Sequence, residues 1–215
     1  MLNTQSDEVL IGLYQNGREE AFSILFQRHR KGIYNFILRF FHQGQVAEDL
    51  FQEAFLKLVK NASRYENKTK FTTWMYAIVR NLCIDEYRKL KIRKVVSLEE
   101  EVKLRKGSDG GEDKKREDYI ADQKPQALDR LVFEERSYYV TKAVEKLSQE
   151  QREVLYLREK QDMSFQEIAE IMGESVNTIK SRMRYALENI RKELKAMGVF
   201  DALKRSEETS HHEVL

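Results

Sequence analysis

The stretch MSFQEIAEIMGESVNTIKSRMRYALENI, residues 163–190, decides how the second half of the chain folds. Ser164 and Glu167 form the S-x-x-E pattern that caps a helix start, and apolar residues follow at helical spacing. Gly173 can end that helix in the left-handed conformation, and Ser175 can cap a second helix. Two helices joined by a three-residue turn that contains glycine predict a helix-turn-helix.

The second helix of this motif has an outward face rich in cations and hydrogen-bonding groups. On a helical wheel, Ile179, Met183 and Ala186 fall on the opposite, core side. A recognition helix meets base edges in the major groove with such a polar face. A solvated basic helix is the alternative, because most charge runs are of that kind. The candidate DNA contacts are Asn177, Thr178, Lys180, Ser181, Arg182 and Arg184.

The rest of the 215-residue chain also shows helical periodicity. Apolar residues recur at spacings of three and four, and there is one proline, which predicts an all-α fold. The charged, glycine-containing stretch at 96–130 cannot bury much apolar surface, so we expect a flexible linker there. It would separate two small helical domains, at 1–95 and 131–196, and a tail would follow at 197–215.

Composition excludes several classes of function. Apolar residues make up 41 % and charged residues 34 %, yet the net charge is only +2, so a nucleic-acid site must come from local clustering. One cysteine and four histidines give no metal-ligand set, and no nucleophile–base pair or phosphate loop occurs. We therefore expect no catalytic residues, metal or cofactor. Without a signal peptide or a membrane-spanning run of ~18 apolar residues, a soluble cytoplasmic protein without membrane insertion is expected.

The segment VAEDLFQEAFLKLVKNASRY, residues 46–65, is expected to form a helix with two contrasting faces. Its apolar side is core. Its other side holds a leucine among carboxylates and an amide, the pattern of a protein-binding patch with an apolar centre and a polar rim. A solvated acidic face with a stray leucine fits the pattern equally well. The candidate protein-binding residues are Asp49, Gln52, Glu53 and Leu56.

The next segment, FTTWMYAIVRNLCIDEYRKLKIRK at 71–94, combines an aromatic, an amide and a basic end. A spacing of seven places Trp74, Asn81 and Arg88 along one strip. Single-stranded nucleic acid suits such a strip, because bases stack on rings while the backbone follows the cations. The alternatives are a tryptophan that is simply core and a basic end that is a solvated helix terminus. The candidate nucleic-acid contacts are Trp74, Asn81, Arg88, Lys89 and Lys91.

Three motifs, EDLFQEAFLKL, FTTWMYAIVRN and SFQEIAEIMGESVNTIKSRMRYALENIRKEL, occur in this order and together resemble the extracytoplasmic-function (ECF) sigma factors of bacteria. The resemblance implies sigma region two in the first domain and region four in the second. It implies that Asp49, Gln52 and Glu53 dock on the β′ coiled coil of core RNA polymerase. It implies that residues 71–94 read and open the −10 element of promoter DNA, with Asn81 near a flipped base. It also implies that the last helix reads the −35 element and that region four contacts the β flap.

The same resemblance implies an anti-sigma factor as a partner, since family members are often held inactive by a membrane-linked protein of that kind. Two other classes remain open from the residues alone. A self-sufficient helix-turn-helix regulator would bind promoter DNA tightly without polymerase; the receiver type carries alternating strands and helices, a pattern the first half lacks. A nucleic-acid-processing enzyme would need carboxylates or histidines converging on a metal, and their spacing here does not provide that.

Overall fold

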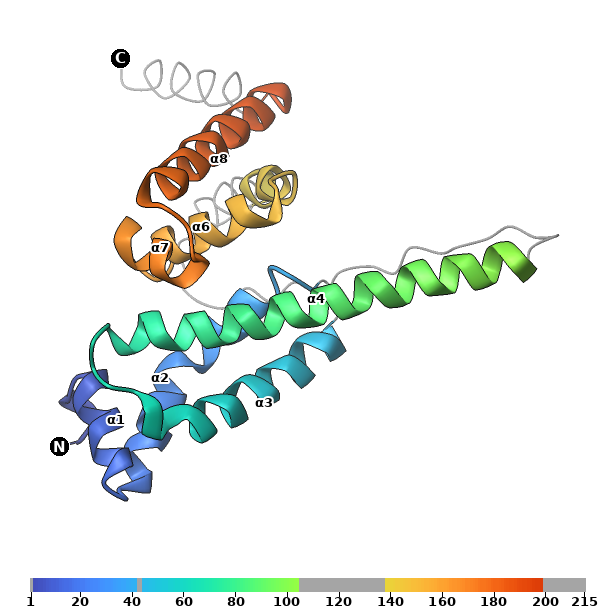
Figure 1. Ribbon diagram of the computed structural model, residues 1–215. Coiled ribbons are helices and arrows are strands. Elements are labelled where there is room, and N and C mark those ends of the chain that lie inside the picture. Colours follow the sequence, from blue (N-terminus) through green and yellow to red (C-terminus); the bar gives the residue numbers. More distant parts are fainter. Residues whose placement is uncertain (1, 42–43, 105–137, 199–215) are drawn as a thin grey trace, which may run out of the picture. The chain divides into compact units, whose positions relative to one another are not determined.

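The computed structural model describes residues 2–41, 44–104 and 138–198, with side chains as far as residue 93 in the second range. Within these ranges the regular structure is helical and contains no strand, which confirms the predicted all-α class. Short 3-10 turns lie at Leu2–Thr4 and Ala62–Arg64, and residues 138–145 are helical. The labelled α-helices (Figure 1) are α1 (Asp7–Gln15), α2 (Glu19–Ile37), α3 (Gly44–Asn61), α4 (Phe71–Leu104), α6 (Gln149–Glu159), α7 (Phe165–Met172) and α8 (Val176–Ala196).

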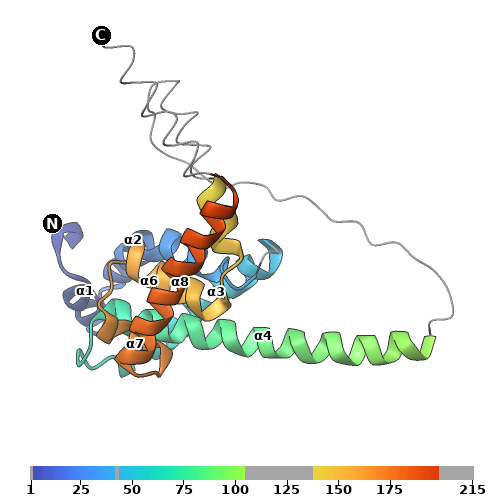
Figure 2. The same ribbon diagram turned by 90° about the horizontal axis from the view of Figure 1, so that it is seen from above.

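Two compact units are distinguished along the chain. The first combines residues 1–88 with residues 147–189, and the second combines residues 89–146 with residues 190–215. Helices α1, α2, α3, α6 and α7 belong wholly to the first unit, whereas α4 and α8 begin there and continue into the second. Figure 2 gives a second view of these helices. The first unit therefore draws residues from both sides of the predicted linker, and the boundaries at 1–95 and 131–196 stay a prediction.

Local caps and a shared core explain how the first helices form. The Ser6 side chain caps α1 by accepting a hydrogen bond from the Val9 N–H at 3.3 Å. The Glu8 carboxylate accepts from the Phe71 N–H at 3.0 Å, so α1 supplies a partner for the first residue of α4. The apolar side chains of α1, α2 and α3 that face inward are buried, namely Leu10, Ile11, Ala21, Leu25, Ile33, Phe36, Ile37, Ala47, Leu50, Ala54 and Leu58.

Helix α4 is longer than the sequence predicted. We expected the helical segment to end at Lys94 and a flexible linker to begin at residue 96, whereas α4 continues to Leu104. Six of the ten residues at 95–104, VVSLEEEVKL, are Leu, Glu or Lys, which are strong helix formers, and the next glycine is Gly107. Residues 96–104, the first part of the predicted linker, therefore continue α4 as a helix. The remainder of the predicted linker, from residue 105, and the tail from residue 199 lie outside the described residues.

The predicted helix-turn-helix is present and is formed by α7 and α8. The Ser164 hydroxyl accepts from the Glu167 N–H at 3.2 Å, and the Glu167 carboxylate accepts from the Ser164 N–H at 2.7 Å, which completes a capping box. Gly173 has φ +67° and ends α7 in the left-handed conformation that glycine adopts without strain. The Ser175 hydroxyl accepts from the Thr178 N–H at 3.1 Å and starts α8. One local side chain or glycine therefore sets each boundary of the motif.

Candidate nucleic-acid and protein interfaces

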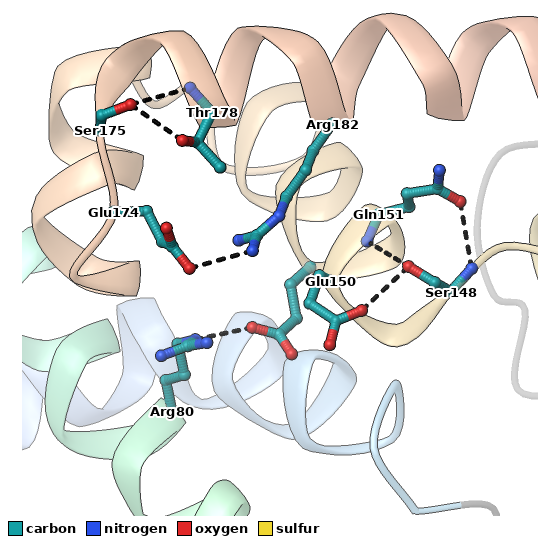
Figure 3. Close-up of polar contacts among 9 residues, drawn as sticks. Arg80, Ser148, Glu150, Gln151, Glu174, Ser175, Thr178 and Arg182 are labelled. Carbon is teal, nitrogen blue, oxygen red and sulfur yellow. Dashed lines mark hydrogen bonds and ion pairs between the residues drawn. The ribbon is translucent and has the colours of Figure 1, made fainter.

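The first half of α8 presents an accessible polar side. Ile179, Met183 and Ala186 are buried on the opposite side of the helix, as the periodicity predicted. At the helix start, the hydroxyls of Ser175 and Thr178 lie 2.9 Å apart (Figure 3). Side-chain donors on an accessible helix of this kind can reach base edges in a major groove. Five of the predicted DNA contacts lie on this side of α8. The exposed ones are Asn177, Lys180 and Arg184, and the partly exposed ones are Thr178 and Ser181.

Arg182 points toward the turn that precedes α8. Its Nη2 atom pairs with the Glu174 carboxylate in that turn (Figure 3), at a distance of 3.0 Å, and 26 % of the Arg182 side chain is exposed. Glu150, at the start of α6, has a lowered pKa, chiefly because it accepts a backbone hydrogen bond and in part because Arg182 lies nearby. The structure therefore places Arg182 among carboxylates, in a different environment from Lys180 and Arg184.

An aromatic ring adds to the polar side of α8. The Arg184 guanidinium lies over the Tyr185 ring, 4.9 Å from its centroid, and half of the Tyr185 surface is exposed. The Arg184 Nε atom is also 3.9 Å from the Glu188 carboxylate. Tyr185 was not among the predicted contacts. Its signal in the sequence was an aromatic residue next to a cation on the outward side of the helix.

The candidate strip on α4 is only partly accessible. The Trp74 ring is half-buried against Tyr65 and Phe71, with centroids 5.3 and 5.7 Å away. Asn81 and Arg88 are exposed, as are Lys89 and Lys91 further along the helix. Trp74 therefore packs against neighbouring aromatic rings, as the alternative of a core tryptophan predicted, and part of its surface remains exposed.

The candidate protein-binding patch on α3 is exposed in all four positions, Asp49, Gln52, Glu53 and Leu56. Leu56 is 60 % exposed and forms the apolar centre. Val59, one turn further along α3, is also exposed and enlarges that centre, which the sequence reading missed. The Glu53 carboxylate lies 3.4 Å from Lys57 Nζ, so the rim contains both signs of charge. An apolar centre with a polar rim is typical of a protein-binding surface.

Two charged residues that the sequence reading passed over form an ion pair. Arg80 Nε donates to the Glu153 carboxylate at 2.7 Å, and their side chains are 13 % and 2 % exposed, so Glu153 is buried and Arg80 is mostly buried. Burial raises the pKa of the Glu153 carboxyl, and the Arg80 charge acts against that rise. The sequence did indicate that Glu153 faces the core, because a helical wheel of α6 places it about 40° from the apolar Leu157.

The described residues contain no group of three or more His, Cys, Asp or Glu side chains that could hold a metal ion. The histidine pair at the C-terminal end lies outside them. None of the described helices combines the length and the apolar character that crossing a membrane requires.

Family comparisons agree with this arrangement. Residues 25–92 match Sigma-70 region 2, and residues 143–192 match Sigma-70 region 4. The ECF RNA polymerase sigma factor SigW of Bacillus subtilis is 30 % identical over 181 residues, which cover 84 % of this chain and 92 % of SigW. The ECF sigma-E factor of Escherichia coli K12 is 30 % identical over 189 residues, which cover 86 % of this chain and 92 % of that factor. The sigma-H factor of Pseudomonas aeruginosa is 27 % identical over 201 residues, which cover 92 % of this chain and 98 % of that factor.

Two solved structures share the fold. CnrH, in complex with the cytosolic domain of CnrY, has a TM-score of 0.59 at 20 % identity and covers 89 % of this chain and 99 % of its own. The sigma factor RpoE of Bartonella quintana, in complex with the anti-sigma factor NepR, has a TM-score of 0.56 at 22 % identity. The match covers 81 % of this chain and 96 % of RpoE. Both sigma regions match in the expected order, and relatives at 30 % identity span most of both chains. This chain therefore belongs to the ECF sigma factors, which direct promoter-specific initiation of transcription by RNA polymerase.

Proposed function

We propose that this sigma factor divides its work among three helices: α8 reads the −35 element, α4 reads and opens the −10 element, and α3 docks on core polymerase. The observation that carries the proposal is the accessible polar side of α8, which begins at the capped turn after Gly173. Sigma factors are initiation factors rather than catalysts. We assign this chain recognition alone, with the bond-forming chemistry left to the polymerase.

For the −35 element, Lys180 and Arg184 are the proposed readers of guanine, and Asn177 is the proposed reader of adenine, because these pairings match the donors and acceptors of each base edge. Thr178 and Ser181 are placed to meet bases or phosphates beside them. Arg182, held by Glu174 at 3.0 Å, supports a phosphate contact or a positioning role rather than base reading.

For the −10 element, Asn81 on α4 is the proposed contact of a flipped base. Its exposure on the same helix as Arg88 supports this role, because the basic end can follow the phosphate backbone while bases leave the stack. Trp74 is half-buried between its aromatic neighbours, so we propose that it offers an edge on which one base can stack. Lys89 and Lys91 extend the cationic part of this surface.

For the polymerase, the patch of Asp49, Gln52, Glu53 and Leu56 is the proposed contact of the β′ coiled coil, and region four is proposed to meet the β flap. The exposed leucine supports this, because large apolar side chains ringed by polar groups are typical of binding hot spots. An anti-sigma factor is a further proposed partner, since the related RpoE was solved with one. We propose that the chain acts in the cytoplasm, where its polymerase transcribes.

In vitro transcription with core polymerase over a library of randomised −35 sequences tests the assignment of α8. Lys180→Ala and Arg184→Ala should change which −35 sequences are transcribed, whereas wild type and a Lys192→Ala control should share one preference. Lys192 is an exposed cation on the same helix, about 120° around from Lys180. Preferences that stay the same in both variants would show that this face is assigned incorrectly. Tight promoter binding by the chain alone would instead favour a self-sufficient regulator.

A further inference from the structure

Helix α1 lies ahead of the residues that match Sigma-70 region 2, yet it contacts the part of that region that leads into α4. The family match begins at residue 25, whereas α1 covers Asp7–Gln15. Residues 62–70 connect α3 to α4 and belong to the same compact unit as α1 (Figure 1). The contacts of α1 with this connection therefore bear on how α4 begins.

Both ends of α1 hold the backbone where α3 leads into α4. In the first turn of α1, the Glu8 carboxylate accepts from the Phe71 N–H at 3.0 Å. At the last residue of α1, the Gln15 side-chain amide donates to the carbonyls of Ala62 and Tyr65, at 2.8 Å each. These partners lie 47 to 63 positions away in the sequence. Helix α1 thus spans the connection from its start to the first residue of α4.

Two of the residues held by α1 are the ring neighbours of Trp74. The Trp74 ring centroid lies 5.3 Å from that of Tyr65 and 5.7 Å from that of Phe71. The Tyr65 and Phe71 rings are buried and lie 6.0 Å apart, whereas Trp74 is half-buried. In a close-packed interior a buried ring moves only with its own backbone. The hydrogen bonds from Glu8 and Gln15 therefore fix the two rings against which Trp74 packs.

The Tyr65 hydroxyl holds the rest of the connection. It donates to the Thr69 carbonyl at 2.7 Å and lies 3.2 Å from the Asn67 side-chain oxygen. Asn67 has φ +53°, in the left-handed region that asparagine tolerates better than most residues. Burial raises the pKa of the Tyr65 hydroxyl to about 12, and the charges of Glu8 and Asp7 add to the rise, so the hydroxyl remains a donor near neutral pH.

Helix α1 is itself anchored on α2. The Asp7 carboxylate lies 2.6 Å from Arg28 Nη1 and 2.7 Å from His29 Nε2. Burial alone would raise the pKa of Asp7, but the hydrogen bonds of His29 and Arg28 outweigh burial and lower it. Leu10 and Ile11 are buried further along the helix. Because α1 is fixed at its start and along its length, it can restrain the connection rather than move with it.

We propose that α1 is a brace that positions Trp74 for promoter opening. Its positioning residues are Glu8 and Gln15, which act through the two rings beside Trp74 and touch no base. They keep the exposed part of Trp74 in one orientation, so that a base leaving the duplex meets a ring already in place. The role in opening rests on the proposed function of Trp74, whereas the brace itself does not.

Fluorescence of the full-length free chain tests the brace without polymerase or DNA. Trp74 is the single tryptophan of the sequence, so tryptophan-selective excitation reports on this residue alone. Glu8→Ala removes the acceptor of the Phe71 N–H and should raise the acrylamide quenching constant roughly 1.5-fold or more, because a helix start without its cap frays. Glu8→Gln loses the same charge but keeps an oxygen that accepts this hydrogen bond, so its quenching should match that of the wild-type chain.

A second pair of variants tests the other end of α1. Gln15→Glu keeps the shape of the side chain but removes its amide donor, so the quenching constant should rise here too. Asn16→Asp is the matched control, because it makes the same exchange one residue later, where the amide donates to the Gly12 carbonyl within α1 itself. Wild-type quenching in Glu8→Ala and Gln15→Glu, or an equal rise in the controls Glu8→Gln and Asn16→Asp, would overturn the brace.

Permanganate footprinting with the holoenzyme tests the role in opening. Glu8→Ala should lower the yield of reactive thymines roughly threefold or more, in line with the loss of one helix cap, at unchanged affinity for core polymerase. Glu8→Gln should restore the wild-type yield. A loss of polymerase affinity as large as the loss of opening would overturn a specific role in opening.

Trp74→Ala, footprinted in parallel, separates this inference from the function on which it rests. A wild-type footprint for Trp74→Ala would overturn the proposed function of Trp74 and with it the link to opening, and the brace would still be decided by the fluorescence of the free chain. A reduced footprint for Trp74→Ala beside a wild-type footprint for Glu8→Ala would overturn the link between the brace and opening alone.

Discussion

Arg182 and Glu174 form an ion pair of 3.0 Å between the first half of α8 and the turn that precedes it. The Glu174 carboxylate therefore pairs with a cation that could otherwise bind a DNA phosphate, and it lies next to the start of α8. Both effects oppose DNA binding, because a negative charge there repels the phosphate backbone while Arg182 is held in place.

Replacing Glu174 with Gln should strengthen promoter binding by the holoenzyme. The variant removes one negative charge and frees Arg182, so one more phosphate contact becomes available. The slope of log affinity against log salt should steepen by about 0.9 for that contact. Filter binding or fluorescence anisotropy across a salt series measures this slope. Arg182→Ala should weaken all promoters alike, and a change of −35 preference in that variant would contradict the assigned role.

Charge reversal at Glu53 should weaken the binding of core polymerase. Asp49→Ala with Glu53→Lys removes two carboxylates from the exposed patch on α3, and we expect at least a fivefold rise in Kd, about 1 kcal/mol. Glu48→Lys is the matched control, because Glu48 is exposed on the same helix but lies about 140° around it from Glu53, the residue whose charge is reversed. Circular dichroism should show unchanged helix content in both proteins. Equal affinity of the double variant and the control would refute the patch.

Loss of the Asn81 side chain should impair strand opening and leave polymerase binding intact. Asn81→Ala removes the proposed contact of a flipped base, and Trp74→Ala should cost ~1–3 kcal/mol for one lost stacking contact. Permanganate footprinting of the open complex measures the reactive thymines, while a parallel titration measures affinity for core polymerase. A wild-type footprint for Asn81→Ala on a native promoter would count against this role.

The Glu153 contribution to the stability of the first compact unit should be lost as pH rises. Burial raises the pKa of Glu153 above its ordinary value of 4.5, and the Glu150 charge adds to the rise, while Arg80 opposes it. The folded unit therefore binds this proton more tightly than the unfolded chain does. The contribution is fully present below pH 4.5 and is lost as pH rises through the raised pKa.

Glu167 acts in the opposite direction. Burial alone would raise its pKa, but hydrogen bonds from Lys70 and Ser164 outweigh burial and lower it in the folded unit, so its contribution is lost as pH falls. Urea unfolding between about pH 4.5 and 7.5 measures the balance as a free energy of unfolding. Glu153→Gln should abolish the part of the pH dependence in which stability falls with rising pH, and Glu167→Gln should leave that part. If Glu153→Gln tracks the wild-type curve, the buried carboxyl does not contribute to the pH dependence.

Local signals made the helix-turn-helix predictable from the sequence. Ser164, Glu167, Gly173 and Ser175 act on residues within a few positions of themselves, so their effect is visible in a short stretch. The acidic side of α3 was predictable for a similar reason, because one helix's periodicity separates core from surface. The end of α4 was not, since residues 95–104 favour a helix strongly enough to continue it despite their charge.

The contact between Arg80 and Glu153 could not be predicted in this way. The two residues are separated by 73 positions, and no local rule indicates which buried charges will pair. A glutamate on the apolar side of α6 is unusual, but its position in the sequence does not identify the residue with which it pairs. The residues assigned to DNA and polymerase stay predictions, because exposure shows only that they are accessible.

Glu167 uses its two carboxylate oxygens for two different partners. One accepts from the Ser164 N–H at the start of α7, and the other pairs with Lys70 of region 2. A change at Glu167 would therefore alter the start of the helix-turn-helix together with its ion pair to Lys70, whereas a change at Lys70 would alter the ion pair alone. Position 70 can therefore vary among homologues without disturbing the cap of α7, whereas position 167 keeps that cap only as Glu or Gln.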